Sequence, residues 1–167
     1  SGVAALATSL NNLEDIKNQM KNQTIGHDKV NQLRHVRYFK DIDGIRAHMR
    51  RHADVIRPKF EIVERTFDEQ LEGLGIGSWT VPNGGYFISF ETLEGCAKKV
   101  VSRCKKAGVT LTGAGATYPY HRDPADSNIR IAPTYPSVED LAKAADLFAL
   151  CVKLVSVDKL LEDSENK

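Results

Sequence analysis

A long run of apolar residues at helical spacing, between residues 41 and 71, constrains the fold of this 167-residue chain more than any other feature. Apolar side chains recur mostly three or four residues apart through the run, at Ile42, Ile45, Met49, Val55, Ile56, Phe60, Val63 and Phe67. This spacing is typical of an amphipathic helix. Asp41 or Asp43 can cap its start, and Pro58 removes a backbone hydrogen bond inside it. The sequence therefore predicts one long helix that is interrupted and bent near Pro58.

Shorter elements are expected before this helix. Residues 2–8 are small and branched, which predicts a short buried strand. Residues 12–21 carry apolar side chains at helical spacing behind three candidate N-caps, Ser9, Asn11 and Asn12. A second helix is predicted over residues 28–39.

The chain after the long run alternates strands with helices. Strands are predicted at residues 79–81, 86–91, 109–111 and 129–132, and helices at residues 94–107 and from the N-cap Ser137 to about Leu161. A loop rich in glycine, proline and aspartate at residues 113–127 is longer than most connections, which is typical of a functional loop. This order predicts an α+β fold, with a small antiparallel or mixed sheet whose helices pack on one face.

Composition is that of an ordinary globular protein and argues against several kinds of partner. Hydrophobic residues make up 41% and charged residues 27%, with a net charge of +1, so no overall imbalance points to nucleic acid. Residues 29–59 are basic and could form a nucleic-acid-binding helical pair, but the acidic residues 61–72 balance them, which favours a solvated or subunit-facing surface. No apolar run reaches the roughly 20 residues of a membrane span. Three cysteines without a CxxC pair indicate reduced thiols in a cytoplasmic protein.

Arg130 is the strongest candidate for a ligand-binding residue. It lies between Ile129 and Ile131 in a short predicted strand, so it faces the opposite side from these two if they face the core. A guanidinium held on a strand offers a planar pair of donors that suits a carboxylate. The alternative is a solvent-facing arginine on an edge strand.

Gly84 and Gly85 precede an aromatic pair, Tyr86 and Phe87. Glycines at this point favour a hairpin turn, a close backbone approach to a ligand, or both. Gly84, Gly85 and Tyr86 are therefore possible lining residues of an active site.

His48 and His52 are four residues apart, as zinc ligands on one helix face can be. Met49 stands where a HExxH motif requires glutamate, and no third ligand is evident. Partly exposed histidines and no metal site are therefore expected.

Several short motifs follow one another in a specific order. They are Pro82-Asn83-Gly84-Gly85-Tyr86-Phe87, a helix, Gly108-Val109, the loop from Gly113 to Tyr118, and Asn128-Ile129-Arg130-Ile131-Ala132. This order resembles the small domain of fold-type I pyridoxal-phosphate aminotransferases. The stretch from Gln23 to His35, together with Arg57-Pro58-Lys59-Phe60, resembles more narrowly an aspartate-aminotransferase-like bacterial subgroup. The resemblance covers essentially the whole chain.

The resemblance implies that this chain is the C-terminal portion of an aminotransferase. Residues 1–42 would be the tail of the large, cofactor-binding domain, and residues 43–167 the linking helix and the small domain. Arg130 would bind the substrate α-carboxylate. The lysine that holds pyridoxal phosphate would lie upstream of residue 1, so no catalytic residue is expected in this chain, which would be inactive alone. The intact enzyme would be a homodimer acting on amino acids, aspartate among them, and 2-oxo acids.

A second hypothesis belongs to a different functional class. The same fold could serve as a stand-alone module that binds a carboxylate ligand or a protein partner. A lysine in a Ser/Thr-rich segment just upstream would support the enzyme, and a native start at Ser1 would support the module.

Overall fold

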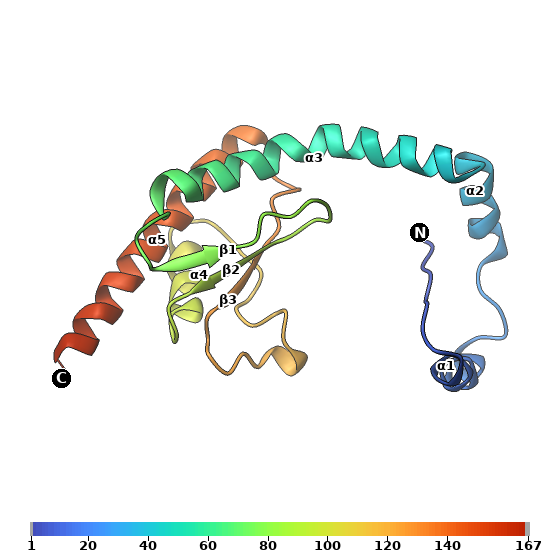
Figure 1. Ribbon diagram of the computed structural model, residues 1–167, viewed down its shortest axis with the longest axis horizontal. Coiled ribbons are helices and arrows are strands. Elements are labelled where there is room, and N and C mark those ends of the chain that lie inside the picture. The colour runs from blue at the N-terminus through green and yellow to red at the C-terminus, as the bar shows by residue number, and fades with distance from the viewer. Residues whose placement is uncertain (1, 166–167) are drawn as a thin grey trace. The chain divides into compact units, whose positions relative to one another are not determined.

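The computed structural model describes residues 2–165, which divide into two compact units between Ala53 and Asp54. The N-terminal unit, up to Ala53, contains α1 (Leu10–Gln23), α2 (Lys29–Phe39) and the first part of α3 (Ile42–Gln70). The C-terminal unit contains the rest of α3 and all later elements (Figure 1). These are β1 (Gly77–Trp79), β2 (Ile88–Thr92), α4 (Ala97–Lys106), the 3₁₀ turn η1 (Pro119–His121), β3 (Asn128–Ile131) and α5 (Val138–Glu165).

The two predicted helices of the N-terminal unit are confirmed. Ser9 caps α1 by accepting from the backbone N–H of Asn12, and Asp28 caps α2 in the same way. The strand predicted at residues 2–8 is wrong, because this segment is exposed and has no strand assignment. A strand needs a neighbour to bond its backbone, and no described residue pairs with this segment in a sheet.

Helix α3 runs without a break from Ile42 to Gln70 and contains Pro58. Asp41 caps it through a 2.9 Å hydrogen bond from the backbone N–H of Gly44. The expected interruption at Pro58 is therefore wrong, because its missing N–H removes one bond of the ladder while the bonds on either side keep the helix continuous. A bend at this residue stays a prediction.

The sheet has three antiparallel strands in the order β1-β2-β3. Trp79 lies opposite Phe90, and Ser89 lies opposite Arg130. This sheet with its helices confirms the predicted α+β fold class.

The end of α4 explains why the strand predicted at residues 109–111 is wrong. Gly108 adopts a left-handed conformation with φ +96°, and its N–H bonds to the carbonyl of Lys105. The N–H of Val109 bonds to the carbonyl of Cys104 at 2.9 Å. This pair of bonds closes the helix as a Schellman motif. The N–H of Val109 therefore ends the helix instead of joining the sheet.

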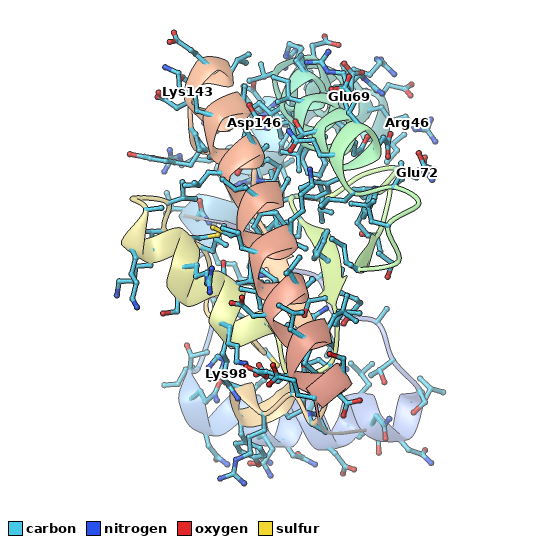
Figure 2. The ribbon with its side chains drawn as sticks, turned by 90° about the vertical axis from the view of Figure 1, so that its left-hand side faces the viewer. Arg46, Glu69, Glu72, Lys98, Lys143 and Asp146 are labelled. Carbon is cyan, nitrogen blue, oxygen red and sulfur yellow. The ribbon has the colours of Figure 1, made fainter. Side chains whose placement is uncertain are left out.

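Helix α5 starts as predicted, with Ser137 Oγ accepting from the backbone N–H of Asp140 at 3.1 Å. It extends to Glu165, beyond the expected end near Leu161. Figure 2 shows α5 crossing the C-terminal unit beside α4, with which it packs. Asp146, labelled there, accepts a 2.7 Å hydrogen bond from Gln70 Nε2 at the end of α3.

The core of the C-terminal unit is built around three phenylalanines from different elements. The Phe90 ring on β2 lies 5.2 Å from the Phe67 ring on α3 and 5.0 Å from the Phe148 ring on α5, measured between centroids. Trp79 stacks on Phe90 at 6.0 Å. Gly77 leaves room for Phe90, because a Cβ there would lie 2.6 Å from its Cζ. The core therefore joins the sheet to both long helices.

The three cysteines, Cys96, Cys104 and Cys151, are free and buried. Burial and contact with Cys151 raise the pKa of the Cys104 thiol to about 12. None of the helices over residues 2–165 is both long and apolar enough to cross a bilayer.

Candidate functional site

The two faces of the β2–β3 pair differ in chemistry. Ile88, Phe90 and Ile129 point into the core and are fully buried. The opposite face carries the alternate residues, which we call the arginine face: Phe87, Ser89, Glu91, Asn128 and Arg130. This alternation follows from the two-residue period of a strand. The prediction that Arg130 faces away from Ile129 and Ile131 is confirmed.

Arg130 is held on this face without an acidic partner. Its guanidinium carbon lies 4.4 Å from the centroid of the Phe87 ring, in a cation–π contact. Its Nε is buried and makes no hydrogen bond, and no ion pair joins Arg130 to any of residues 2–165. A buried donor without a partner costs free energy. The arrangement therefore suits an external anion that can accept from the guanidinium.

Asn128 organises the polar groups beside the arginine. It is 4% exposed, and its Nδ2 donates to Ser89 Oγ at 2.9 Å and to Glu91 Oε1 at 2.5 Å. Its Oδ1 accepts from Thr117 Oγ1 in the loop 113–127 at 2.5 Å. Glu91 Oε2 accepts a further bond from Ser127 Oγ at 2.7 Å. The only carboxylate on the arginine face is thus already occupied.

The loop 113–127 is fixed to β3 by Asp123. The carboxylate of this residue accepts from the backbone N–H groups of Asn128 and Ser127, each at 2.8 Å, and of Ala125 at 3.0 Å. The bond from Asn128 is the main cause that lowers the pKa of Asp123, with burial opposing it and the Ser127 bond adding to it. The loop is therefore held beside the arginine face by a charged side chain.

Replacing Asp123 with alanine should loosen this loop. Three hydrogen bonds to a charged acceptor are lost, and we expect a cost of about 1–3 kcal/mol at neutral pH. Because the pKa of Asp123 is lowered in the folded state, its contribution is present above the unfolded pKa and disappears as pH falls through the folded one. Urea denaturation of wild type and variant should give a stability difference that is larger at pH 7 than at pH 3. An equal difference at both pH values would contradict the role of the charge.

The predicted lining residues lie in the connection before β2. Tyr86 is 53% exposed, and Gly85 has φ +93°, a conformation that favours glycine. A Cβ added at Gly84 or Gly85 would meet no atom of this chain within 4 Å. The chain itself therefore does not require these glycines for close packing, and their role as lining residues stays a prediction.

Phe87 is the site residue that the sequence prediction missed. It was noted only as part of an aromatic pair, whereas the structure places its ring under Arg130. The sequence places residues 87 and 89 on one face of the predicted strand, but the position of Arg130 opposite Ser89 follows only from the register of the sheet.

His48 and His52 lie in the part of α3 that belongs to the N-terminal unit, whereas the arginine face belongs to the C-terminal unit. The rings of His48 and His52 are 4.3 Å apart, and burial followed by His52 and Arg51 lowers the pKa of His48. Within residues 2–165 no group of three or more histidine, cysteine, aspartate or glutamate side chains is arranged to hold a metal ion.

An apolar cavity of about 150 Å³ lies on the core side of the sheet. Phe67, Ile131 and Phe148 are among its lining residues, and none of the lining residues is charged. It therefore offers no partner for a carboxylate, unlike the arginine face.

Comparison with known proteins identifies related chains over almost the whole length. The family model described as aspartate amino-transferase matches residues 1–164. An aspartate aminotransferase of Corynebacterium glutamicum is 44% identical over 158 residues, which cover 95% of this chain and 37% of the relative. The crystal structure of an aspartate transaminase from the same organism superposes with a TM-score of 0.82 at 45% identity, over 91% of this chain and 36% of that one.

A more distant structure shares the fold. An α-aminoadipate aminotransferase from Thermus thermophilus, solved with N-(5′-phosphopyridoxyl)-L-leucine, superposes with a TM-score of 0.68 at 17% identity, over 87% of this chain and 36% of that one. The chain thus spans less than two fifths of the length of the relatives that it matches.

Proposed function

Because the chain belongs to the aspartate aminotransferase family, whose members use pyridoxal phosphate, we propose that it is the C-terminal portion of an enzyme that transfers an amino group from an amino acid to a 2-oxo acid. Pyridoxal phosphate, when bound, supplies the electron sink for this chemistry. The role of this chain in the reaction would be to hold the substrate. Aspartate is the first donor to test, because the similar enzymes from Corynebacterium glutamicum carry that name.

The observation that carries the proposal is the unpaired guanidinium of Arg130. A carboxylate on the arginine face could accept from the terminal nitrogens of the guanidinium as a bidentate pair, while Phe87 keeps the guanidinium plane in place. Holding one end of the substrate in this way fixes the orientation of the bond that reacts. Arg130 is therefore the proposed anchor for the α-carboxylate.

The remaining parts of the proposal concern the whole protein. Residues 1–42 would belong to the large domain, and residues 43–167 to the linking helix and the small domain. The cofactor lysine would lie upstream of residue 1, and the active protein would be a cytoplasmic homodimer. Many large side chains of the N-terminal unit are exposed, among them Leu6, Ile25 and Val36, which supports contact with further chain.

The function is tested on the full-length protein supplied with pyridoxal phosphate. We expect oxaloacetate to form from L-aspartate in the presence of 2-oxoglutarate, in a coupled assay with malate dehydrogenase. A screen of other amino donors would then define the specificity. Carboxylate binding without transfer from any amino acid would support the binding module instead.

The isolated chain should form no functional adduct with pyridoxal phosphate. If the cofactor lysine lies outside this sequence, the lysines of this chain should react with pyridoxal phosphate only weakly and unselectively. The purified chain is mixed with the cofactor, desalted, and examined by absorbance and by mass spectrometry after borohydride reduction. A stoichiometric adduct at one lysine, with transaminase activity, would overturn the assignment of this chain as the substrate-holding part.

A further inference from the structure

The side chain of Arg130 has two neighbours on the arginine face that it could contact. Arg130 lies opposite Ser89, so Phe87 and Glu91 are its two diagonal neighbours on β2 and its extension. Diagonal side chains on one face are within reach of each other when they are long. The guanidinium stacks on Phe87, although Glu91 offers a carboxylate of opposite charge. Something must therefore keep Glu91 from pairing with it.

The hydrogen bonds of Glu91 supply the reason. Asn128 Nδ2 bonds to Oε1 and Ser127 Oγ bonds to Oε2, so both oxygens are directed toward the start of β3 and the loop residue before it, away from Phe87. Asn128 is itself fixed, because it is buried and also bonds to Ser89 and Thr117. An amide at this position can bind a carboxylate without adding charge of its own.

We infer that Asn128 is a positioning residue, which holds Glu91 away from Arg130 and so leaves the guanidinium available to an external carboxylate. The inference rests on the proposed function of Arg130. Without Asn128, Glu91 becomes a competitor of the substrate for the same guanidinium. The apparent affinity for substrate is then the intrinsic affinity multiplied by the fraction of molecules in which Arg130 remains unpaired.

The test uses steady-state kinetics of the full-length enzyme with L-aspartate as the varied donor. If Glu91 occupies Arg130 in nine molecules of ten, Asn128→Ala raises KM by about tenfold, with kcat within about threefold of wild type. The double variant Asn128→Ala/Glu91→Gln should bring KM back to within about twofold of the Glu91→Gln single variant, because a neutral amide does not compete for the guanidinium. Rescue by removing a charge is not expected if Asn128 only stabilises the strand.

A crystal structure and a second variant test the same point. A crystal structure of Asn128→Ala should show a Glu91 oxygen within salt-bridge distance of Arg130. If this variant does not accumulate as folded protein, Asn128→Leu takes its place, since it nearly keeps the volume, adds no charge and cannot donate to Glu91.

The outcomes separate this inference from the proposed function. If Arg130→Ala raises KM strongly while Asn128→Ala leaves it unchanged, the positioning role is wrong and the carboxylate anchor stands. A raised KM that the double variant does not restore also overturns the positioning role. If neither Arg130→Ala nor Asn128→Ala affects KM, the proposed anchor itself is wrong.

Discussion

Replacing Arg130 with alanine in the full-length enzyme is expected to lower kcat/KM for the amino donor by about 30- to 5,000-fold. Truncating one member of a hydrogen-bonded charge pair costs roughly 2–5 kcal/mol, and each 1.4 kcal/mol corresponds to about tenfold in rate. Arg130→Lys should recover little of the loss, because an ammonium group cannot reproduce two parallel hydrogen bonds to one carboxylate. The measurement is a titration of donor at saturating 2-oxo acid.

Folding should change little in the Arg130 variants, because the side chain makes no internal hydrogen bond or ion pair within residues 2–165. Arg65→Ala is a matched control, since it removes the same group from an exposed position on α3. Values of kcat/KM for Arg130→Ala within threefold of wild type would refute the anchor.

Replacing Phe90 with alanine is expected to destabilise the C-terminal unit by about 3–5 kcal/mol, the usual cost of removing a buried phenylalanine. Phe90 is fully buried and contacts aromatic rings from α3, β1 and α5. The cavity left behind would be lined by groups held from three directions, so little collapse is possible.

The loss can be measured by urea denaturation of the chain, followed by the fluorescence of Trp79, its single tryptophan. Tyr135→Ala is the control, because this side chain is 97% exposed. A Phe90→Ala variant within about 1 kcal/mol of wild type would mean that this ring does not organise the core.

The fold could be predicted wherever one local pattern decided the outcome. Capping residues indicated the starts of α1 and α5, and apolar spacing identified α3, because both signals act within a few residues. The prediction of a strand at residues 109–111 was wrong because β-branched and apolar residues also occur in a segment that follows a helix and lines an apolar cavity. The packing of Gly77 against Phe90 could not be predicted, since it depends on strand register.

The candidate site shows the same limit. The alternation Ile129-Arg130-Ile131 was enough to predict which way Arg130 points. Its contact with Phe87 and the network of Asn128, by contrast, depend on the pairing of residues about 40 positions apart, such as Asn128 with Ser89. Sequence spacing contains no information on that register until the sheet is known.

The most direct measurement of the central claim is a crystal structure of the full-length protein with bound L-aspartate or an unreactive analogue of it. The account predicts that the α-carboxylate lies on the arginine face, with two oxygens each about 2.7–2.9 Å from nitrogens of the Arg130 guanidinium. An α-carboxylate bound by other residues, with Arg130 still stacked on Phe87 and contacting no ligand, would contradict it.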